Sequence, residues 1–180
     1  MHKIVIFLFL IAAGLGYALF SFYGAYSVCY EAHTQVRYTY SELTEHSEEL
    51  ASLSVKTGAF ALKYLPNGRT IVSQMETSAR QIRCPESVND LAISCGRLYS
   101  SMKKVIVLLN DDIKAKNDHR FQDTSLQINK ISRDIVLTGR KYNHAAKRYN
   151  KTLQEPMPRF WSFMFDTEPA QIFKAKKKKS

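Results

Sequence analysis

The chain has 180 residues, 45% of them hydrophobic, so it is neither too short nor too polar to build a core. Its formal net charge of +10 favours anionic surfaces and acidic partners. No recognisable nucleic-acid-binding module accompanies this charge, and we therefore expect no nucleic-acid partner.

The first feature along the chain is an apolar stretch without charged residues over residues 4–30. As a helix, it is long enough to cross a hydrocarbon layer about 30 Å thick. The alternatives are a buried core helix and a cleaved signal peptide, for which Gly16-Tyr17-Ala18 offers small residues. The stretch exceeds a signal core of about 7–15 residues, which favours an uncleaved anchor. Lys3 before it and Glu31 after it favour an extracytoplasmic side for the rest of the chain.

A helical pattern continues beyond the anchor, so we expect one helix to leave the membrane and become the first helix of the bundle. Leu65-Pro66-Asn67-Gly68 interrupts the pattern, and Thr70 is expected to cap a further helical piece that ends at Cys84-Pro85. Apolar positions before the break alternate in steps of three and four, as in a helix with one buried face: Val36, Thr39, Leu43, His46, Leu50, Leu53, Thr57, Phe60 and Tyr64.

Two further stripes of this kind follow. The first begins after Ser87 and ends at Asn110-Asp111-Asp112; its positions are Val88, Leu91, Cys95, Leu98, Met102, Val105 and Leu109. The second belongs to a long helix over about residues 119–153, with Asn117 and Asp118 as N-cap candidates and Pro156 and Pro158 after its end. Its stripe consists of Thr124, Ile128, Ile131, Ile135, Thr138, Tyr142, Ala145 and Tyr149.

These patterns predict an all-α fold, a long antiparallel bundle of three to four helices whose N-terminal transmembrane helix continues into the first helix. No stretch alternates with a period of two for long enough to predict a sheet. An acidic patch at Glu42, Glu45, Glu48 and Glu49 and the basic long helix are expected to lie side by side. The predicted parts are an anchor over 1–30, a bundle over 31–155, an aromatic closing segment over 156–173 and a lysine-rich tail over 174–180.

The long helix carries a repeated pair, Tyr142-Asn143 and Tyr149-Asn150, one heptad apart. With Gly139-Arg140-Lys141 before the pair, this region resembles the LemA family. The resemblance covers about residues 105–175 and includes further positions, namely Ile113-Lys114-Ala115, Phe121, Phe165, Pro169, Phe173 and Ala175. The front half departs from the family pattern, whose Pro-Asn motif has its nearest counterpart here in Leu65-Pro66-Asn67.

The resemblance implies a single-pass protein of the bacterial inner membrane with a helical bundle, no known catalytic centre and a role in organising the envelope or an intracellular membrane. The residues agree with a non-enzymatic reading, since the sequence displays no phosphate loop, no nucleophile elbow and no histidine pair at ligand spacing. We therefore expect no catalytic residues, no cofactor and no metal, and a core or edge position for His46. A scaffold of this kind implies an unidentified protein partner or self-association.

The Tyr-Asn pairs have two interpretations. In the structural one, the rings of Tyr142 and Tyr149 fill the core while Asn143 and Asn150 reach a neighbouring helix from the edge of the stripe. In the functional one, they form a docking surface for a second protein.

The cysteines also leave two alternatives open. Cys84 and Cys95 either form a disulfide, if the domain is extracytoplasmic, or remain unpaired small hydrophobes. Eleven helical residues rise about 16 Å, so a disulfide requires the chain to turn between them.

The C-terminal end suggests an alternative function, the binding of anionic lipid or another acidic partner. Aromatic residues followed by lysines are typical of segments that lie on anionic membranes. The alternative is that the aromatics cap the open end of the bundle and the lysines are solvated. The residues concerned are Trp161, Phe163, Phe165, Lys174, Lys176, Lys177, Lys178 and Lys179.

Overall fold

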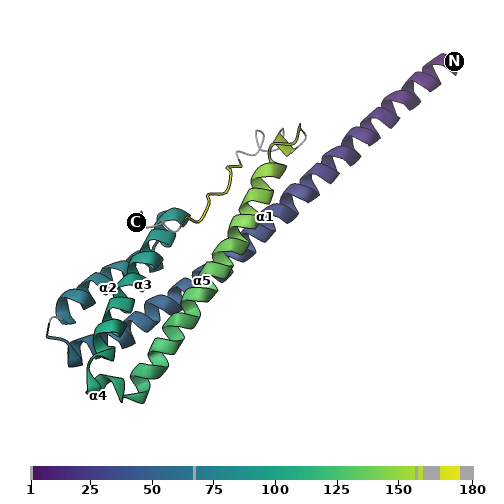
Figure 1. Ribbon diagram of the computed structural model, residues 1–180. Coiled ribbons are helices and arrows are strands. Elements are labelled where there is room, and N and C mark those ends of the chain that lie inside the picture. The colour runs from purple at the N-terminus through teal and green to yellow at the C-terminus, as the bar shows by residue number, and fades with distance from the viewer. Residues whose placement is uncertain (1, 67, 157, 160–166, 175–180) are drawn as a thin grey trace. The chain divides into compact units, whose positions relative to one another are not determined.

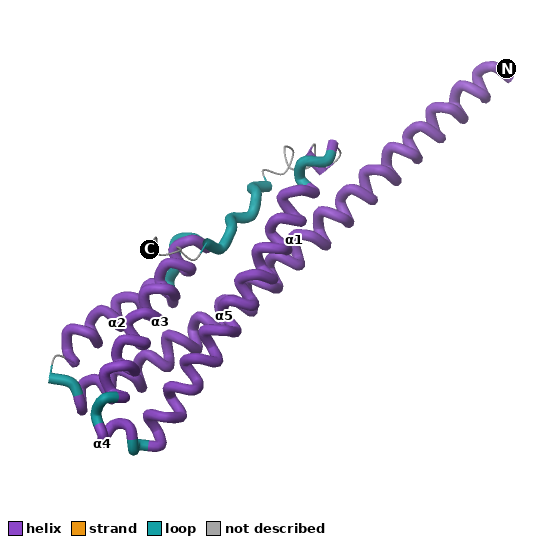
Figure 2. Tube along the Cα trace, in the orientation of Figure 1, coloured by secondary structure: helices purple, strands orange, loops and turns teal. Residues whose placement is uncertain are grey.

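The computed structural model describes residues 2–66, 68–156, 158–159 and 167–174, and nearly all of this part of the chain is helical (Figure 1). The elements are α1 (His2–Tyr64), α2 (Gly68–Arg83), α3 (Val88–Asn110), α4 (Ile113–Lys116) and α5 (His119–Thr152). Figure 2 shows the turns between them and the non-helical segment 167–174. No strand occurs among the described residues, and the predicted all-α class is confirmed.

The three predicted stripes form the buried faces of their helices. On α5 every stripe position is buried, from Thr124 to Tyr149. On α3 the positions from Leu91 to Leu109 are buried. On α1 the stripe is buried except at His46, Phe60 and Tyr64, which are half-buried. Burial of these side chains is the main force that holds the helices together, because the transfer of apolar surface out of water drives their association.

The helix ends follow local chemistry. Ser87 is the N-cap of α3 and accepts a hydrogen bond from the Asp90 amide at 3.1 Å. Asp112 caps α4 in the same way, accepting from the amides of Lys114 and Ala115. The predicted cap at Asp118 is confirmed, since its carboxylate accepts from the Arg120 amide at 3.0 Å. These caps satisfy amides that have no partner within the helix.

The turn between α1 and α2 depends on Gly68. The glycine amide donates to the Leu65 carbonyl at 3.1 Å, and a Cβ atom built on Gly68 would lie 2.7 Å from the Ala61 carbonyl carbon. Only a residue without a side chain allows α2 to start this close to the last turn of α1. The predicted cap at Thr70 is wrong, because α2 has already begun at Gly68.

The chain divides into two compact units. One contains residues 38–144 and the chain from 171 onwards. In this unit α2 packs against α3, and α1 runs antiparallel to α5. The antiparallel direction follows from two ring contacts, Phe60 with Phe121 at 5.7 Å and Tyr40 with Tyr142 at 5.9 Å between centroids.

The other unit contains residues 1–37 and 145–170. Here the ring of His33 lies 5.5 Å from that of Tyr149. Residues 6–20 of α1 expose their side chains on all sides, and partial burial begins at Ser21. Within the described residues, α1 is the helix that is long and apolar enough to cross a membrane by length and composition, criteria that a signal sequence can also meet.

Candidate functional site

Among the described residues, several side-chain hydrogen bonds join α5 to the non-helical segment 167–174. The Asn143 side chain pairs with the backbone of Phe173 in both directions. Its amide nitrogen donates to the Phe173 carbonyl at 2.8 Å, and its amide oxygen accepts from the Phe173 N–H at 2.8 Å. A side-chain amide thus satisfies the backbone donor and the backbone acceptor of a residue that lies outside any helix.

Two neighbours of Asn143 complete this contact. The Tyr142 hydroxyl donates to the Gln171 carbonyl at 2.8 Å, and burial raises the pKa of this phenol, with Tyr40 as a secondary cause. The Phe173 ring lies against Gly139, where an added Cβ atom would be 2.9 Å from two ring carbons. Phe173 is therefore held by its backbone at Asn143 and by its ring at a position where α5 has no side chain.

The same arrangement recurs seven residues later, within the unit formed by 1–37 and 145–170. The Asn150 amide nitrogen donates to the Ala170 carbonyl at 2.9 Å, and its oxygen accepts from the Ala170 N–H at 2.8 Å. Burial raises the pKa of the neighbouring Tyr149 phenol, Cys29 adds to this effect, and a hydrogen bond with Thr167 opposes it.

The expectation that Asn143 and Asn150 reach a neighbouring helix is wrong, because both bind the chain's own non-helical segment. Their amide groups are thereby occupied by Phe173 and Ala170.

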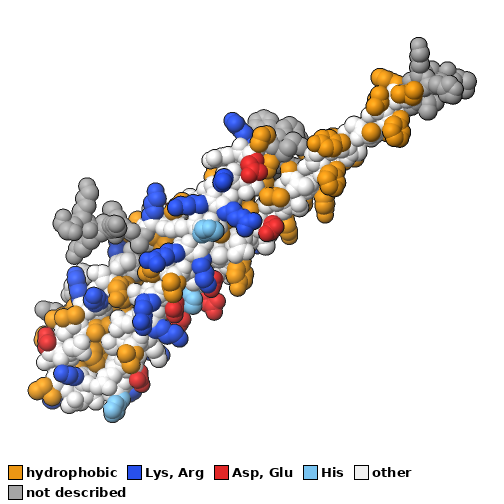
Figure 3. Space-filling model, turned by 45° about the vertical axis from the view of Figure 1, so that its right-hand side comes forward, with side chains coloured by type: hydrophobic (Ala, Val, Ile, Leu, Met, Phe, Trp, Pro, Cys, Tyr) orange, Lys and Arg blue, Asp and Glu red, His pale blue; other side chains and the backbone are white. Residues whose placement is uncertain are grey.

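The basic helix and the acidic patch do meet, but only in part. Within the patch, Glu42 pairs with Lys141 at 3.0 Å. Arg148 lies 4.0 Å from Glu31, which is outside the patch. Both pairs are largely exposed and contribute little to stability individually. Further basic side chains of α5 remain on the surface, and Lys and Arg gather on the face shown in Figure 3.

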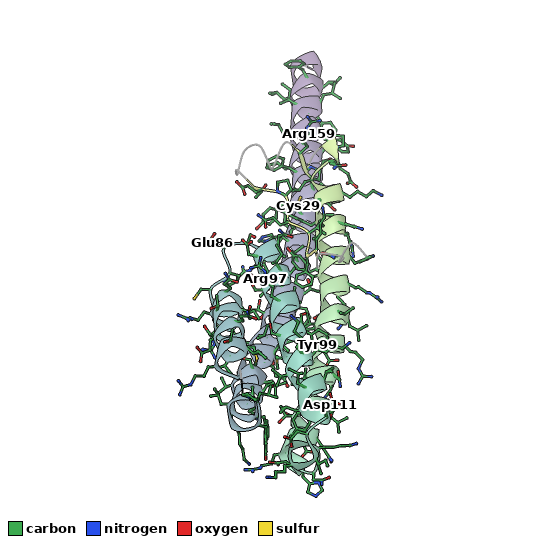
Figure 4. All side chains as sticks on the ribbon, turned by 60° about the vertical axis from the view of Figure 1, so that its left-hand side comes forward. Cys29, Glu86, Arg97, Tyr99, Asp111 and Arg159 are labelled. Carbon is green, nitrogen blue, oxygen red and sulfur yellow. The ribbon has the colours of Figure 1, made fainter. Side chains whose placement is uncertain are left out.

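The three cysteines are free thiols. The disulfide between Cys84 and Cys95 is not formed: Cys84 is exposed, whereas Cys95 is buried and its thiol lies 3.4 Å from the Ser47 hydroxyl. Burial raises the pKa of Cys95 to about 11, with the Ser47 hydrogen bond as an opposing cause. Cys29, labelled in Figure 4, lies on α1 and is half-buried.

His46 lies at the edge of the core, as expected. Its ring nitrogen Nδ1 is buried without a hydrogen bond and lies 3.9 Å from the Glu49 carboxylate. Among the described residues, no three His, Cys, Asp or Glu side chains gather as metal ligands.

A groove of about 670 Å³ follows the outer side of α2 and α3. Small and polar residues line most of it, and Arg97, labelled in Figure 4, contributes the one charge among its described lining residues. Its lining gives no indication of what it would bind.

The aromatic and lysine residues named from the sequence fall mostly outside the described residues, namely Trp161, Phe163, Phe165, Lys176, Lys177, Lys178 and Lys179. Lys174 is described and exposed. The binding of lipid or of an acidic partner by this segment therefore remains a prediction.

Sequence reasoning missed the contacts of Gln171 and Ala170, and it gave Gly139 only as part of the family motif. The first two act through backbone atoms, which leave no trace in the choice of side chain. The signal for Gly139 was its position four residues before Asn143, where a glycine in a helix interior requires a packing reason.

A model of the LemA family matches residues 62–180 of this chain. The match extends further toward the N-terminus than the region around 105–175 that the motifs indicated, and it begins shortly before Leu65-Pro66-Asn67. A comparison with curated proteins finds no match.

Proposed function

This chain belongs to the LemA family, and on that premise we propose that it is a non-enzymatic, single-pass scaffold that holds a helical bundle at a bacterial inner membrane. The observation that carries this proposal is the continuity of α1, which runs from His2 to Tyr64 without a break. The apolar segment and a core helix of the bundle are parts of one helix. The bundle is therefore attached to the proposed anchor without an intervening linker.

The exposure pattern of α1 supports the anchor. A core helix of a soluble protein buries at least one face, whereas residues 6–20 expose large apolar side chains on every face. In water this surface would be unfavourable, and in a hydrocarbon layer it is the preferred arrangement. Residues 2–20 in helical form span about 28 Å, close to the thickness of that layer.

The Tyr-Asn contacts support a scaffold over an enzyme. The polar groups of Tyr142, Asn143 and Asn150 are engaged with the chain's own backbone, at Gln171 and Phe173 in one unit and at Ala170 in the other. They hold the C-terminal segment against the helix. The proposal therefore assigns these contacts an architectural role. It also places the part of the chain that follows the anchor on the extracytoplasmic side.

Membrane extraction of the full chain tests the proposal. The chain should remain in the membrane pellet after sodium carbonate treatment, with Met1 or His2 still present by mass spectrometry. A mature N-terminus close to residue 19 would instead identify a cleaved signal and contradict the anchor. Protease accessibility of a C-terminal tag in spheroplasts tests the side of the membrane, and protection of the tag would overturn the extracytoplasmic assignment.

A further inference from the structure

The outward side of α5 carries unpaired basic residues at helical spacing. In the unit of residues 38–144, Lys130, Arg133 and Arg140 are exposed, and no described carboxylate lies within ion-pair distance of them. Leu126 and Leu137 continue the same stripe in steps of three and four, with 68% and 54% of their surface exposed. This face combines positive charge with uncovered leucine, as a docking face does.

The outward side of α1 in the same unit has the opposite charge. Glu45, Glu48 and Glu49 are exposed, and among the described residues only Glu49 lies near a possible ion-pair partner, the His46 ring at 3.9 Å. Val55 and Leu62 continue from Glu48 in steps of seven, with 67% and 53% of their surface exposed. The acidic part of this stripe covers residues 45–49, because Lys56 and Lys63 occupy the positions seven and fourteen residues after Glu49. This acidic part and the basic stripe of α5 are complementary in charge, and each stripe carries two exposed apolar side chains.

The acidic and basic groups also lie at corresponding heights. Glu42 and Lys141 are in contact at 3.0 Å, so they mark one level of the antiparallel pair. Glu49 lies seven residues after Glu42 on α1, and Arg133 lies eight residues before Lys141 on α5. Because a helix rises about 1.5 Å per residue, Glu49 and Arg133 lie at nearly the same level.

We propose that the chain associates with a second copy of itself, with the acidic stripe of α1 in each copy packed against the basic stripe of α5 in the other. The proposal rests on the proposed anchor in one respect, because two copies anchored in one membrane enter it in the same direction. A two-fold axis parallel to the helices of residues 38–144 gives both copies one height, so α1 of one copy runs antiparallel to α5 of its neighbour. The carboxylate of Glu49 then faces the level of Arg133 in the second copy without any vertical shift.

A two-fold axis parallel to the helices satisfies both stripes at once. Rotation about such an axis places each α1 against the other copy's α5, so the two contacts are equivalent and the assembly closes as a dimer. Exposed ion pairs mainly provide specificity and depend on salt, and burial of the exposed leucines and valines provides the remaining stabilisation.

Charge reversal with mixing tests this arrangement. One variant of the full chain carries Glu45→Lys, Glu48→Lys and Glu49→Lys, and the other carries Lys130→Glu, Arg133→Glu and Arg140→Glu. Sedimentation in a mild detergent should show a wild-type dimer that weakens with salt, and each variant alone should dimerise at least about tenfold more weakly. Mixing the two variants should restore the dimer, because the reversed α1 stripe of one then meets the reversed α5 stripe of the other.

A matched control is Arg97→Glu with Lys103→Glu and Lys104→Glu, which makes the same change in charge on the exposed side of α3. It should leave dimerisation unchanged. A monomeric wild type, equal weakening by the control, or a mixture that stays monomeric would each overturn the proposal. A further outcome would assign the basic stripe to another, acidic protein. In that outcome the wild type is monomeric and forms a crosslinked product with a protein of different mass, and this product is lost when only the basic stripe is reversed.

The failure of this inference is distinguishable from failure of the anchor. Carbonate extraction reports the anchor independently of oligomeric state. A chain that stays in the membrane but remains monomeric overturns only the dimer. Circular dichroism of each variant confirms that a loss of dimer is not a loss of helix.

Discussion

Replacing Asn143 by alanine separates an architectural role for the Tyr-Asn pairs from a role in docking a partner. The substitution removes the donor and the acceptor that hold the Phe173 backbone, each at 2.8 Å. It leaves the Phe173 N–H and carbonyl without their partner at a half-buried position. The backbone of α5 should be unaffected, because alanine is the best helix former.

The magnitude follows from the two bonds and the change in helix propensity. Neutral hydrogen bonds contribute about 1 kcal/mol each, and alanine exceeds asparagine in helix propensity by up to about 0.7 kcal/mol. The expected loss in the free energy of unfolding is therefore about 1–2 kcal/mol. For a chain of this size, that corresponds to a decrease in Tm of about 2–8 °C.

Two measurements check this prediction. Thermal unfolding of the full chain in a mild detergent, followed by circular dichroism, reports the stability, and hydrogen exchange reports protection of the Phe173 amide. The control is Asn129→Ala, since Asn129 is exposed on the same helix and its side chain forms no hydrogen bond among the described residues. If Asn143→Ala unfolds like the control and the Phe173 amide keeps its protection, the architectural reasoning is refuted.

The remaining predictions concern the first turn, the thiols and the tail. Gly68→Ala should destabilise the chain by about 1–3 kcal/mol because its Cβ would meet the backbone of α1, whereas Gly96→Ala, with open space around it, should stabilise by about 0.5–1 kcal/mol in the same unfolding assay. Thiol labelling at pH 8 with peptide mapping should modify Cys84 and spare Cys95, because the buried thiol stays protonated. Labelling of both Cys84 and Cys95 in the folded chain would contradict the burial of Cys95. Because burial raises the pKa of Cys95 from 9.0 to about 11, the free energy of unfolding should also decline as the pH rises from about 9 to about 11. Deletion of residues 174–180 should reduce the number of phosphatidylglycerol molecules that the full chain retains in native mass spectrometry, and equal retention would reject lipid binding by the tail.

The helical framework could be predicted from the sequence because burial follows a simple period. Side chains at alternating steps of three and four share one face of a helix. Every predicted stripe position of α5 between Thr124 and Tyr149 is buried. Two helix boundaries could also be predicted. Proline removes a backbone donor, which ends a helix near Pro66, and aspartate caps a helix start at Asp118. The predicted cap at Thr70 is wrong because α2 begins at Gly68, where the absence of a side chain allows the close approach to α1.

The contacts of the C-terminal segment could not be predicted in the same way. Asn143 and Asn150 were recognised as important, but their partners are backbone groups of Phe173 and Ala170. Any residue with a free N–H and carbonyl presents the same atoms, so the side chain at such a position carries no signal. Only the absence of a side chain at Gly139 and the presence of a ring at Phe173 are specific, and they are 34 positions apart in the sequence.

The choice of asparagine follows from the needs of the segment that it holds. A segment outside helices and sheets has a backbone donor and acceptor at each residue that secondary structure does not pair, and burying either without a partner is unfavourable. The asparagine amide offers one donor and one acceptor in the geometry of a peptide group, so it can satisfy both at once. Aspartate would lack the donor and leucine would lack both, whereas glutamine would place the amide one bond further from the helix. Each Tyr-Asn pair is therefore explained by how this chain packs its own C-terminal segment.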